Sequence, residues 1–101
     1  MQTRISIPHH DYPARLRSQV EEKLQGLERF YDNVVSMSAK LERESEAHRI
    51  ELVANVGHGA VLVADVKREA FGAALEEAVD RMTAQLKKHH DKIVAYRHGR
   101  R

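Results

Sequence analysis

The 101-residue sequence predicts an α+β fold, a β-α-β-β-β-α two-layer sandwich in which both helices cover one face of a four-stranded sheet. Three observations lead to this prediction. Apolar and polar residues alternate in four short segments, which is the period of half-buried strands. Two longer segments repeat apolar residues every three or four positions, which is the period of amphipathic helices. Each strand has one apolar face, so only one face of the sheet requires a cover.

The first strand and the first helix are predicted from the N-terminal third of the chain. Residues 2–8 (QTRISIP) alternate, with Ile5 and Ile7 on one face, and the strand is expected to end at its proline. Asp11 is the expected N-cap of a helix over residues 12–31, with Pro13 in its first turn, where a missing N–H has no consequence. The helix face expected to be buried comprises Leu16, Val20, Leu24, Leu27 and Phe30.

Three more strands are predicted over residues 34–44, 48–56 and 60–67, where the apolar period returns to two. The polar residues 45–47 are expected to form a loop. Gly57-His58-Gly59 is expected to form a hairpin turn, because glycines adopt positive φ readily. A right-handed first crossover would place strands one and two in parallel, and the last three strands would form an antiparallel meander. The inward positions are expected to be Val35, Met37, Ala39, Leu41, Ile50, Leu52, Ala54, Val56, Ala60, Leu62, Ala64 and Val66.

The last third of the chain, residues 69–101, predicts a long helix with a lopsided charge. Its apolar residues are spaced as on one helix face, at Leu75, Ala78, Val79, Met82, Leu86 and Ile93. Residues 81–101 carry seven Lys and Arg against one Asp, a net charge of +6, whereas residues 1–80 carry ten against fourteen, a net charge of −4. Cations near a helix C-terminus interact favourably with the helix dipole, but seven cations are more than a helix end requires. The basic segment therefore indicates a polyanionic partner.

Arg81, Lys88 and Lys92 are predicted to form a cationic stripe, because they fall within about 40° of one another on a helical wheel. Lys87 lies further round the exposed side. A stripe of one sign can follow a phosphate backbone, whereas a solvated helix face usually mixes signs. The predicted RNA contacts are therefore Arg81, Lys87, Lys88 and Lys92, with Lys40, Arg49 and Lys67 on the outward strand face as weaker candidates.

Catalytic motifs are not found in the sequence. It has no Cys, no nucleophile elbow, no phosphate-binding glycine loop and no HExxH motif. Histidines occur as the adjacent pairs 9–10 and 89–90, which lack the i, i+4 spacing of a helical metal site. His89 is interpreted as a packed or helix-end residue, and His58 as an ordinary turn residue. We therefore expect a protein that is not an enzyme, has no cofactor and binds no metal.

A family resemblance is carried by the predicted last helix. Its segments Ala73-Ala74-Leu75-Glu76, Asp80-Arg81-Met82 and Gln85-Leu86-Lys87-Lys88-His89-His90 resemble those of the ribosome hibernation promoting factor family, also called ribosome-associated inhibitors or ribosomal subunit interface proteins. The resemblance covers residues 73–93 in sequence and residues 1–67 in topology. Gly72, Glu76 and His90 depart from the family pattern, which affects individual contacts more than the fold.

The resemblance implies a fold and a function. The fold would be similar to a double-stranded RNA-binding domain. The protein would insert into the small ribosomal subunit between head and body, cover the mRNA channel and the tRNA sites on the rRNA, and inhibit translation in stationary or stressed cells. The resemblance is to the short form, so we expect neither the additional C-terminal domain of long members nor the acidic tail of the inhibitor type. Ribosome dimerisation by that form involves a second small hibernation factor.

The expected organisation is a single ribosome-binding domain over residues 1–97 and a short basic tail over 98–101. No apolar run reaches the roughly 20 residues of a membrane span, and the N-terminus lacks the apolar centre of a signal peptide, so a cytoplasmic monomer without a membrane partner is expected. Two other classes of function stay open. One is a protein-interaction or assembly module that uses Val53, Val61 and Val63 on the open sheet face, and the other is a small enzyme or metal protein.

Overall fold

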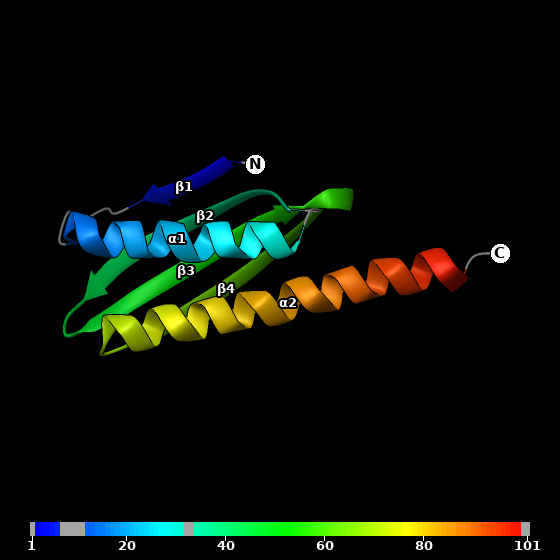
Figure 1. Cartoon of the computed structure of the whole chain (residues 1–101). Coiled ribbons are helices and arrows are strands. Elements are labelled where there is room, and N and C mark those ends of the chain that lie inside the picture. Colours follow the sequence, from blue (N-terminus) through cyan, green and yellow to red (C-terminus); the bar gives the residue numbers. More distant parts are fainter. Residues whose placement is uncertain (1, 7–11, 32–33, 100–101) are drawn as a thin grey trace.

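The structure, a computed structural model, describes residues 2–6, 12–31 and 34–99, and for residues 2–6, 30, 58 and 93–99 it describes the backbone alone. The α+β class, the two helices and the antiparallel meander confirm the prediction (Figure 1). The elements are β1 (Gln2–Ser6), α1 (Ala14–Phe30), β2 (Val34–Glu44), β3 (Ala47–Val56), the 3-10 turn η1 (Gly57–Gly59), β4 (Ala60–Arg68) and α2 (Phe71–Gly99). The described part of α2 therefore runs two residues into the segment expected to be a tail.

The sheet has the strand order β1-β2-β3-β4. β1 runs parallel to β2, and β2, β3 and β4 are antiparallel neighbours. β4 is an edge strand, and both helices lie across the same face of the sheet (Figure 1). The turns that join the meander use positive φ angles, at Ser45 (φ 55°) between β2 and β3 and at Gly59 (φ 75°) between β3 and β4. The glycine was predicted to serve this purpose, because it adopts positive φ without steric cost.

The core lies between the helices and the inner sheet face. The predicted inward residues that are buried in it are Met37, Ala39, Leu41, Ile50, Leu52, Ala54, Val56, Ala64 and Val66 of the strands and Val20, Leu24, Leu27, Leu75, Ala78, Met82 and Leu86 of the helices. Its fully buried large side chains are Val20, Leu24, Met37, Leu41, Ile50, Leu52 and Met82. Leu16, Ala60, Leu62 and Val79, which were expected to be buried, are half-buried. The side chains of Ile5, Phe30 and Ile93 and the whole of Ile7 lie outside the described residues, so the predictions for them are not tested.

The prediction for Val35 is wrong. Its side chain is 62% exposed, whereas that of Val34 is 7% exposed and belongs to the core. The cause is a β-bulge: Val34 is opposite Val56 and Ser36 is opposite Asn55, so Val35 is an extra residue in β2. A bulge reverses the inside–outside alternation on one side of it, and the pattern of Met37 and the later residues was extrapolated across this point.

The start of α1 also differs from the prediction. The helix begins at Ala14, and Pro13 occupies the N-cap position with an extended backbone (φ −64°, ψ 154°) instead of lying in the first turn. The Pro13 carbonyl accepts hydrogen bonds from the backbone N–H groups of Leu16 (3.0 Å) and Arg17 (3.3 Å). Asp11, the expected N-cap, lies outside the described residues.

An aromatic cluster joins the segment just before α1, the β2–β3 hairpin and α2. Tyr12 lies against His48 and Phe71, with ring centroids 5.6 and 5.3 Å away. The Tyr12 hydroxyl donates to the Glu42 carbonyl oxygen (3.1 Å), and its oxygen lies 2.8 Å from His48 Nδ1. The cluster fixes the first turn of α2 over the hairpin end of the sheet.

Candidate nucleic-acid interface

The four main predicted RNA contacts, Arg81, Lys87, Lys88 and Lys92, lie on α2, a helix of 29 residues that extends beyond the sheet on which it packs. Figure 1 shows its C-terminal part, orange to red, extending past the ends of the strands. Ala, Leu, Glu, Lys and Gln dominate the sequence of α2, and these residues favour a helix. Ala74, Leu75, Ala78, Met82 and Leu86 are buried and hold the first four turns on the sheet. The basic residues that follow are therefore presented on a rigid rod.

The cationic stripe of Arg81, Lys88 and Lys92 runs along the flank of α2 that lies beside β4, and all three side chains are exposed. Lys88 and Lys92 line a groove beside β4, and Arg81 contacts Glu77, which pairs with Arg68 at the end of β4. Gln85, between them, donates a hydrogen bond from its amide nitrogen to the Val63 carbonyl oxygen (2.6 Å) and so ties α2 to the edge strand. The sequence-based reasoning missed Gln85. Its place on the helical wheel, between the apolar face and the stripe, is the signal that could have identified it.

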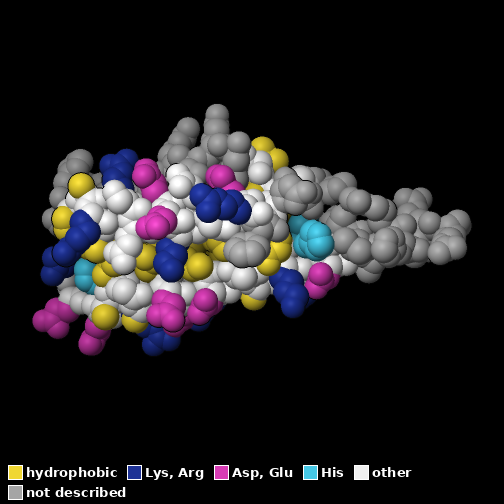
Figure 2. Space-filling model, viewed as in Figure 1, with side chains coloured by type: hydrophobic (Ala, Val, Ile, Leu, Met, Phe, Trp, Pro, Cys, Tyr) yellow, Lys and Arg dark blue, Asp and Glu magenta, His cyan; other side chains and the backbone are white. Residues whose placement is uncertain are grey.

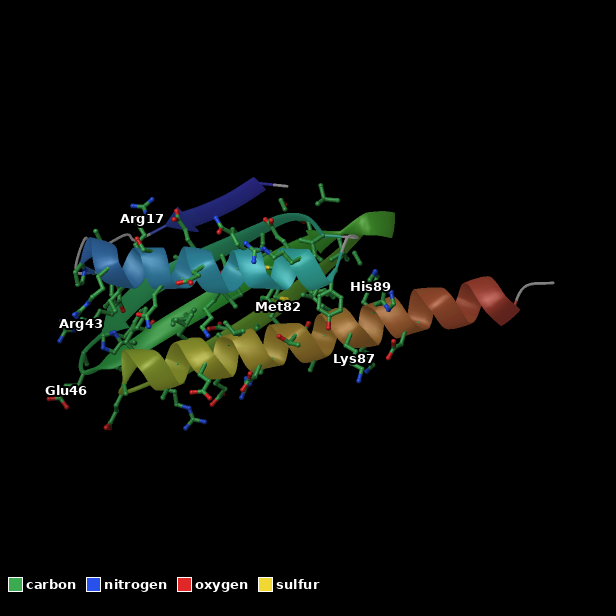
Figure 3. All side chains as sticks on the ribbon, viewed as in Figure 1. Arg17, Arg43, Glu46, Met82, Lys87 and His89 are labelled. Atoms are coloured by element: carbon green, nitrogen blue, oxygen red, sulfur yellow. The ribbon has the colours of Figure 1, made fainter. Side chains whose placement is uncertain are left out.

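A shallow groove of about 260 Å³ separates this flank of α2 from β4, with Lys88 and Lys92 on its rim and Leu62 at its base. His89 also lines this groove. Its Nε2 atom is buried and has no hydrogen-bond partner among the described residues. Half-burial of His89 agrees with its interpretation as a packed residue. Figure 3 shows Met82 and His89 on one side of α2 and Lys87 on the other, so Lys87 presents a separate cation to solvent.

The lysines of α2 are not paired with an acidic residue within the part of the chain that the structure describes. Among the residues that the structure describes, no carboxylate lies within ion-pair distance of Lys87, Lys88 or Lys92. Arg81 differs, since its guanidinium contacts Glu77 at 2.8 Å, and Glu77 also pairs with Arg68. None of the three lysines would therefore have to leave a described carboxylate in order to meet an external anion.

The three weaker candidates on the outer sheet face are already paired. Lys40 contacts Glu42 (3.1 Å) and Lys67 contacts Glu44 (3.0 Å). Arg49 bridges Asp65 (2.6 Å) and Glu44 (3.5 Å). Arg49, Lys67, Glu44 and Asp65 thus form a neutral surface network beside the separate Lys40–Glu42 pair. An external phosphate would have to compete with a protein carboxylate for each of these cations. The structure does not bring these residues together with the stripe on α2.

The outer-face network makes stability depend on pH. Hydrogen bonding and attraction to Lys67 lower the pKa of Glu44, and the hydrogen bond from Arg49 lowers the pKa of Asp65. A carboxyl whose pKa is depressed in the folded state contributes stability above its ordinary pKa, and this contribution is lost as the pH falls through the depressed value.

Arg49→Gln should therefore reduce the free energy of unfolding at neutral pH and make no difference in strong acid. The measurement is urea denaturation of both proteins at about pH 7 and about pH 2, either side of the ordinary carboxyl range. Arg43→Gln is the control, because Arg43 is exposed and forms no ion pair with a described residue. A difference between wild type and Arg49→Gln that persists at the acid pH would contradict this account.

Metal and membrane sites are not found in the described part of the chain. No group of three or more His, Cys, Asp or Glu residues gathers there as a metal site would require. None of the helices described is long and apolar enough to cross a membrane. The side chains of Arg97, Arg100 and Arg101, the remaining cations of the basic segment, lie outside the description.

Comparison with known proteins gives a family match and curated relatives. The model of the Sigma 54 modulation protein / S30EA ribosomal protein family matches residues 3–94. A ribosome hibernation promoting factor of Azotobacter vinelandii is 35% identical over 101 residues, covering 100% of this chain and 94% of that protein. A protein of the same name from Pseudomonas putida is 32% identical over 92 residues, covering 91% of this chain and 89% of the relative.

Two solved structures share the fold. A ribosomal subunit interface protein from Coxiella burnetii superposes with a TM-score of 0.81 at 14% identity, covering 90% of this chain and 99% of that one. The N-terminal domain of Thermus thermophilus Protein Y superposes with a TM-score of 0.77 at 23% identity, covering 88% and 99%. At such identities the likeness concerns the fold alone.

Proposed function

The chain belongs to the Sigma 54 modulation protein / S30EA ribosomal protein family, and on that premise we propose that it is a ribosome hibernation factor. In this proposal it binds the small ribosomal subunit in the mRNA and tRNA channel and inhibits translation in stationary or stressed cells. Its mechanism is steric and electrostatic and needs no catalysis. A rigid domain occupies the channel, and its cations replace the counterions that the rRNA would otherwise condense.

The observation that carries the proposal is the contrast between the two sets of cations. Lys87, Lys88 and Lys92 on α2 have no counter-charge among the described residues, whereas the cations of the sheet face are paired. We assign the main phosphate contacts to these lysines and to Arg81, which exchanges Glu77 for a phosphate on binding. Lys40, Arg49 and Lys67 are secondary contacts, because each would have to leave a carboxylate first.

The remaining features of the proposal follow from the family. Residues 1–97 act as the ribosome-binding domain, with residues 98–101 as a basic extension that adds non-specific attraction. The free protein is a cytoplasmic monomer, and a second small factor acts with it where ribosomes pair. Because both helices lie on one sheet face, we expect the fold to resemble a double-stranded RNA-binding domain.

Sedimentation of stationary-phase lysate tests the proposal directly. The protein should travel with small subunits or with whole ribosomes, and a protein found only at the top of the gradient would contradict the proposal.

Salt dependence is expected to reveal how many phosphates the protein contacts. Four contacts, by Arg81, Lys87, Lys88 and Lys92, should give a log–log slope of affinity against salt of about −3 to −4. Replacing any one of the three lysines by Ala should reduce that slope by about one unit and weaken binding to different RNA sequences alike. Fluorescence anisotropy with labelled rRNA fragments measures both quantities. A flat salt dependence would count against phosphate contacts.

The alternative is an assembly module on the open sheet face, and one observation favours it. Val61 and Val63 are 57% and 46% exposed, and Val63 is directly opposite Val53 on the neighbouring strand. Exposed apolar clusters often mark protein contacts. Such a contact would survive high salt and would be weakened by Val61→Ser, whereas the proposed RNA contact would be lost in high salt and leave Val61→Ser unaffected.

A further inference from the structure

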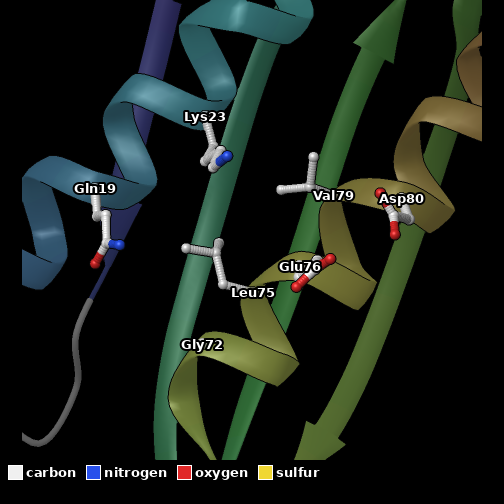
Figure 4. A pocket seen from close by; sticks show the side chains of 7 residues that line it. All are labelled: Gln19, Lys23, Gly72, Leu75, Glu76, Val79 and Asp80. Carbon is white, nitrogen blue, oxygen red and sulfur yellow. The ribbon is translucent and has the colours of Figure 1, made fainter.

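The two helices do not pack tightly against each other, and a groove runs between them over the sheet. One stretch has a volume of about 470 Å³ and is lined from both helices (Figure 4). It adjoins a second stretch of about 570 Å³, since Gln19, Lys23 and Val79 line both. Along α2 the groove extends from Gly72 to Thr83, about 16 Å at the helical rise. That length fits roughly five residues of an extended peptide.

The base of the groove is apolar. Leu75 and Val79 of α2 point towards α1 between the helices (Figure 4), and Leu27 of α1 continues this surface. Figure 2 shows hydrophobic side chains exposed along the line between the two helices, with acidic side chains beside them. Val79 is only half-buried although it packs against the core. An apolar side chain inserted here would complete the burial of Val79.

The rim of the groove is acidic. Glu22 of α1 and Glu76 and Asp80 of α2 line it, and Lys23 is the one cation among its lining residues. None of the three carboxylates forms an ion pair with a described residue. Three acids against one base leave a net charge of −2, which repels phosphate and attracts a cationic partner.

Two glycines of the groove have no explanation within the fold. A Cβ atom added to Gly26 or Gly72 would meet no atom within 4 Å, and neither residue has a positive φ. Gly26 nevertheless lies inside α1, where glycine destabilises a helix by about 1 kcal/mol relative to Ala. Their missing side chains keep the groove open, which is expected where another chain approaches closely.

From these observations we propose that the groove between α1 and α2 is a docking site for a lysine- or arginine-rich segment of a partner protein. An apolar residue of that segment inserts against Leu75 and Val79, and its flanking cations pair with Glu22, Glu76 and Asp80. The site is separate from the proposed RNA contact. Val79 and Arg81 are two residues apart, about 200° on the helical wheel, so the groove and the cationic stripe lie on opposite flanks of α2. Both can be occupied at once.

The test uses the full-length protein labelled with ¹⁵N and three synthetic peptides of about ten residues, twice the extended length that the groove holds. The first alternates Leu with Lys, the second alternates Leu with Glu, and the third alternates Ser with Lys. The Leu–Lys peptide should shift the amide resonances of residues 19–27 and 72–83 in a saturable manner and leave those of residues 87–92 unchanged. The Leu–Glu and Ser–Lys peptides should bind more weakly by about tenfold or more, because each lacks one of the two complementary features.

Two variants and a matched control locate the binding. Removing two rim charges with Glu76→Gln and Asp80→Asn should weaken the Leu–Lys peptide about five- to tenfold. Gly26→Leu places a side chain in the groove, where a Cβ atom would meet no atom of the fold within 4 Å, and should weaken binding of the peptide further. The control, Glu46→Gln with Glu69→Gln, removes the same charge from exposed sites outside the groove and should have no effect. The proposal would be overturned if the control weakened binding equally or if the Leu–Glu peptide bound equally well. It would also be overturned by resonance shifts confined to residues 87–92, or by the absence of any saturable shift. An RNA oligonucleotide that shifted the groove resonances would also overturn it.

Discussion

Replacing Arg81, Lys88 and Lys92 together by Glu is expected to abolish co-sedimentation with ribosomal particles. All three side chains are exposed along one flank of α2, and each replacement exchanges a cation for an anion. Three charge-assisted contacts to phosphate are lost and three repulsions are added. At about 1.5 kcal/mol for each lost contact, affinity should fall by more than about 1,000-fold, before repulsion is counted. The measurement is pelleting of the purified variant with ribosomes at low salt.

The control for this experiment must separate local contact from net charge. Replacing Arg15, Arg29 and Arg43 by Glu changes the charge of the protein by the same amount at exposed positions on α1 and β2. This control variant should still pellet with ribosomes, with affinity reduced only by the weaker long-range attraction. Both variants should keep the circular dichroism spectrum of the wild type, since no core residue is altered. Equal loss of pelleting in the two variants would mean that overall charge, and not the stripe, governs binding.

The fold could be predicted from the sequence because its strands and helices differ in apolar period and each element buries one face. The bulge at Val35 could not, since a bulge is a property of two paired strands. Only the pairing of Val34 with Val56 and of Ser36 with Asn55 reveals the extra residue. Within β2 alone, Val34 and Val35 are equivalent apolar residues. Nothing in the local sequence indicates which of the two is buried.

The candidate site was predictable to the extent that it depends on one helix. The wheel positions of Arg81, Lys88 and Lys92 follow from their spacing, and the structure places all three on the flank beside β4. The pairing of the strand cations depends on register. Arg49 is opposite Lys67, so its carboxylate partner Asp65 is a diagonal neighbour that only the β3–β4 alignment brings within reach. The groove between the helices depends on how far apart two elements pack, which neither helix encodes alone.

The register itself is tested by Leu52→Ala, which should lower the free energy of unfolding by about 2–5 kcal/mol. Leu52 is fully buried in the central strand β3. Its partners are Ala39 on β2 and Ala64 on β4, so the neighbouring side chains are small and cannot spread into the cavity that the substitution leaves. Because the penalty grows with residual cavity volume, the value should lie in the upper half of this range. Urea denaturation measures it, and a fall in Tm of more than about 10 °C should accompany it.

The adjacent residue supplies the matched comparison for this test. Val53 points to the outer sheet face, where it is half-buried, so Val53→Ala should cost less than about 1 kcal/mol. Successive residues of a strand face opposite sides of the sheet, and a slip of one position would exchange the two environments. A loss below about 0.5 kcal/mol for Leu52→Ala, together with a larger loss for Val53→Ala, would mean that β3 is paired one residue out of register. The outward positions of Arg49 and Val63 would then be wrong as well, since both are assigned from the same pairing.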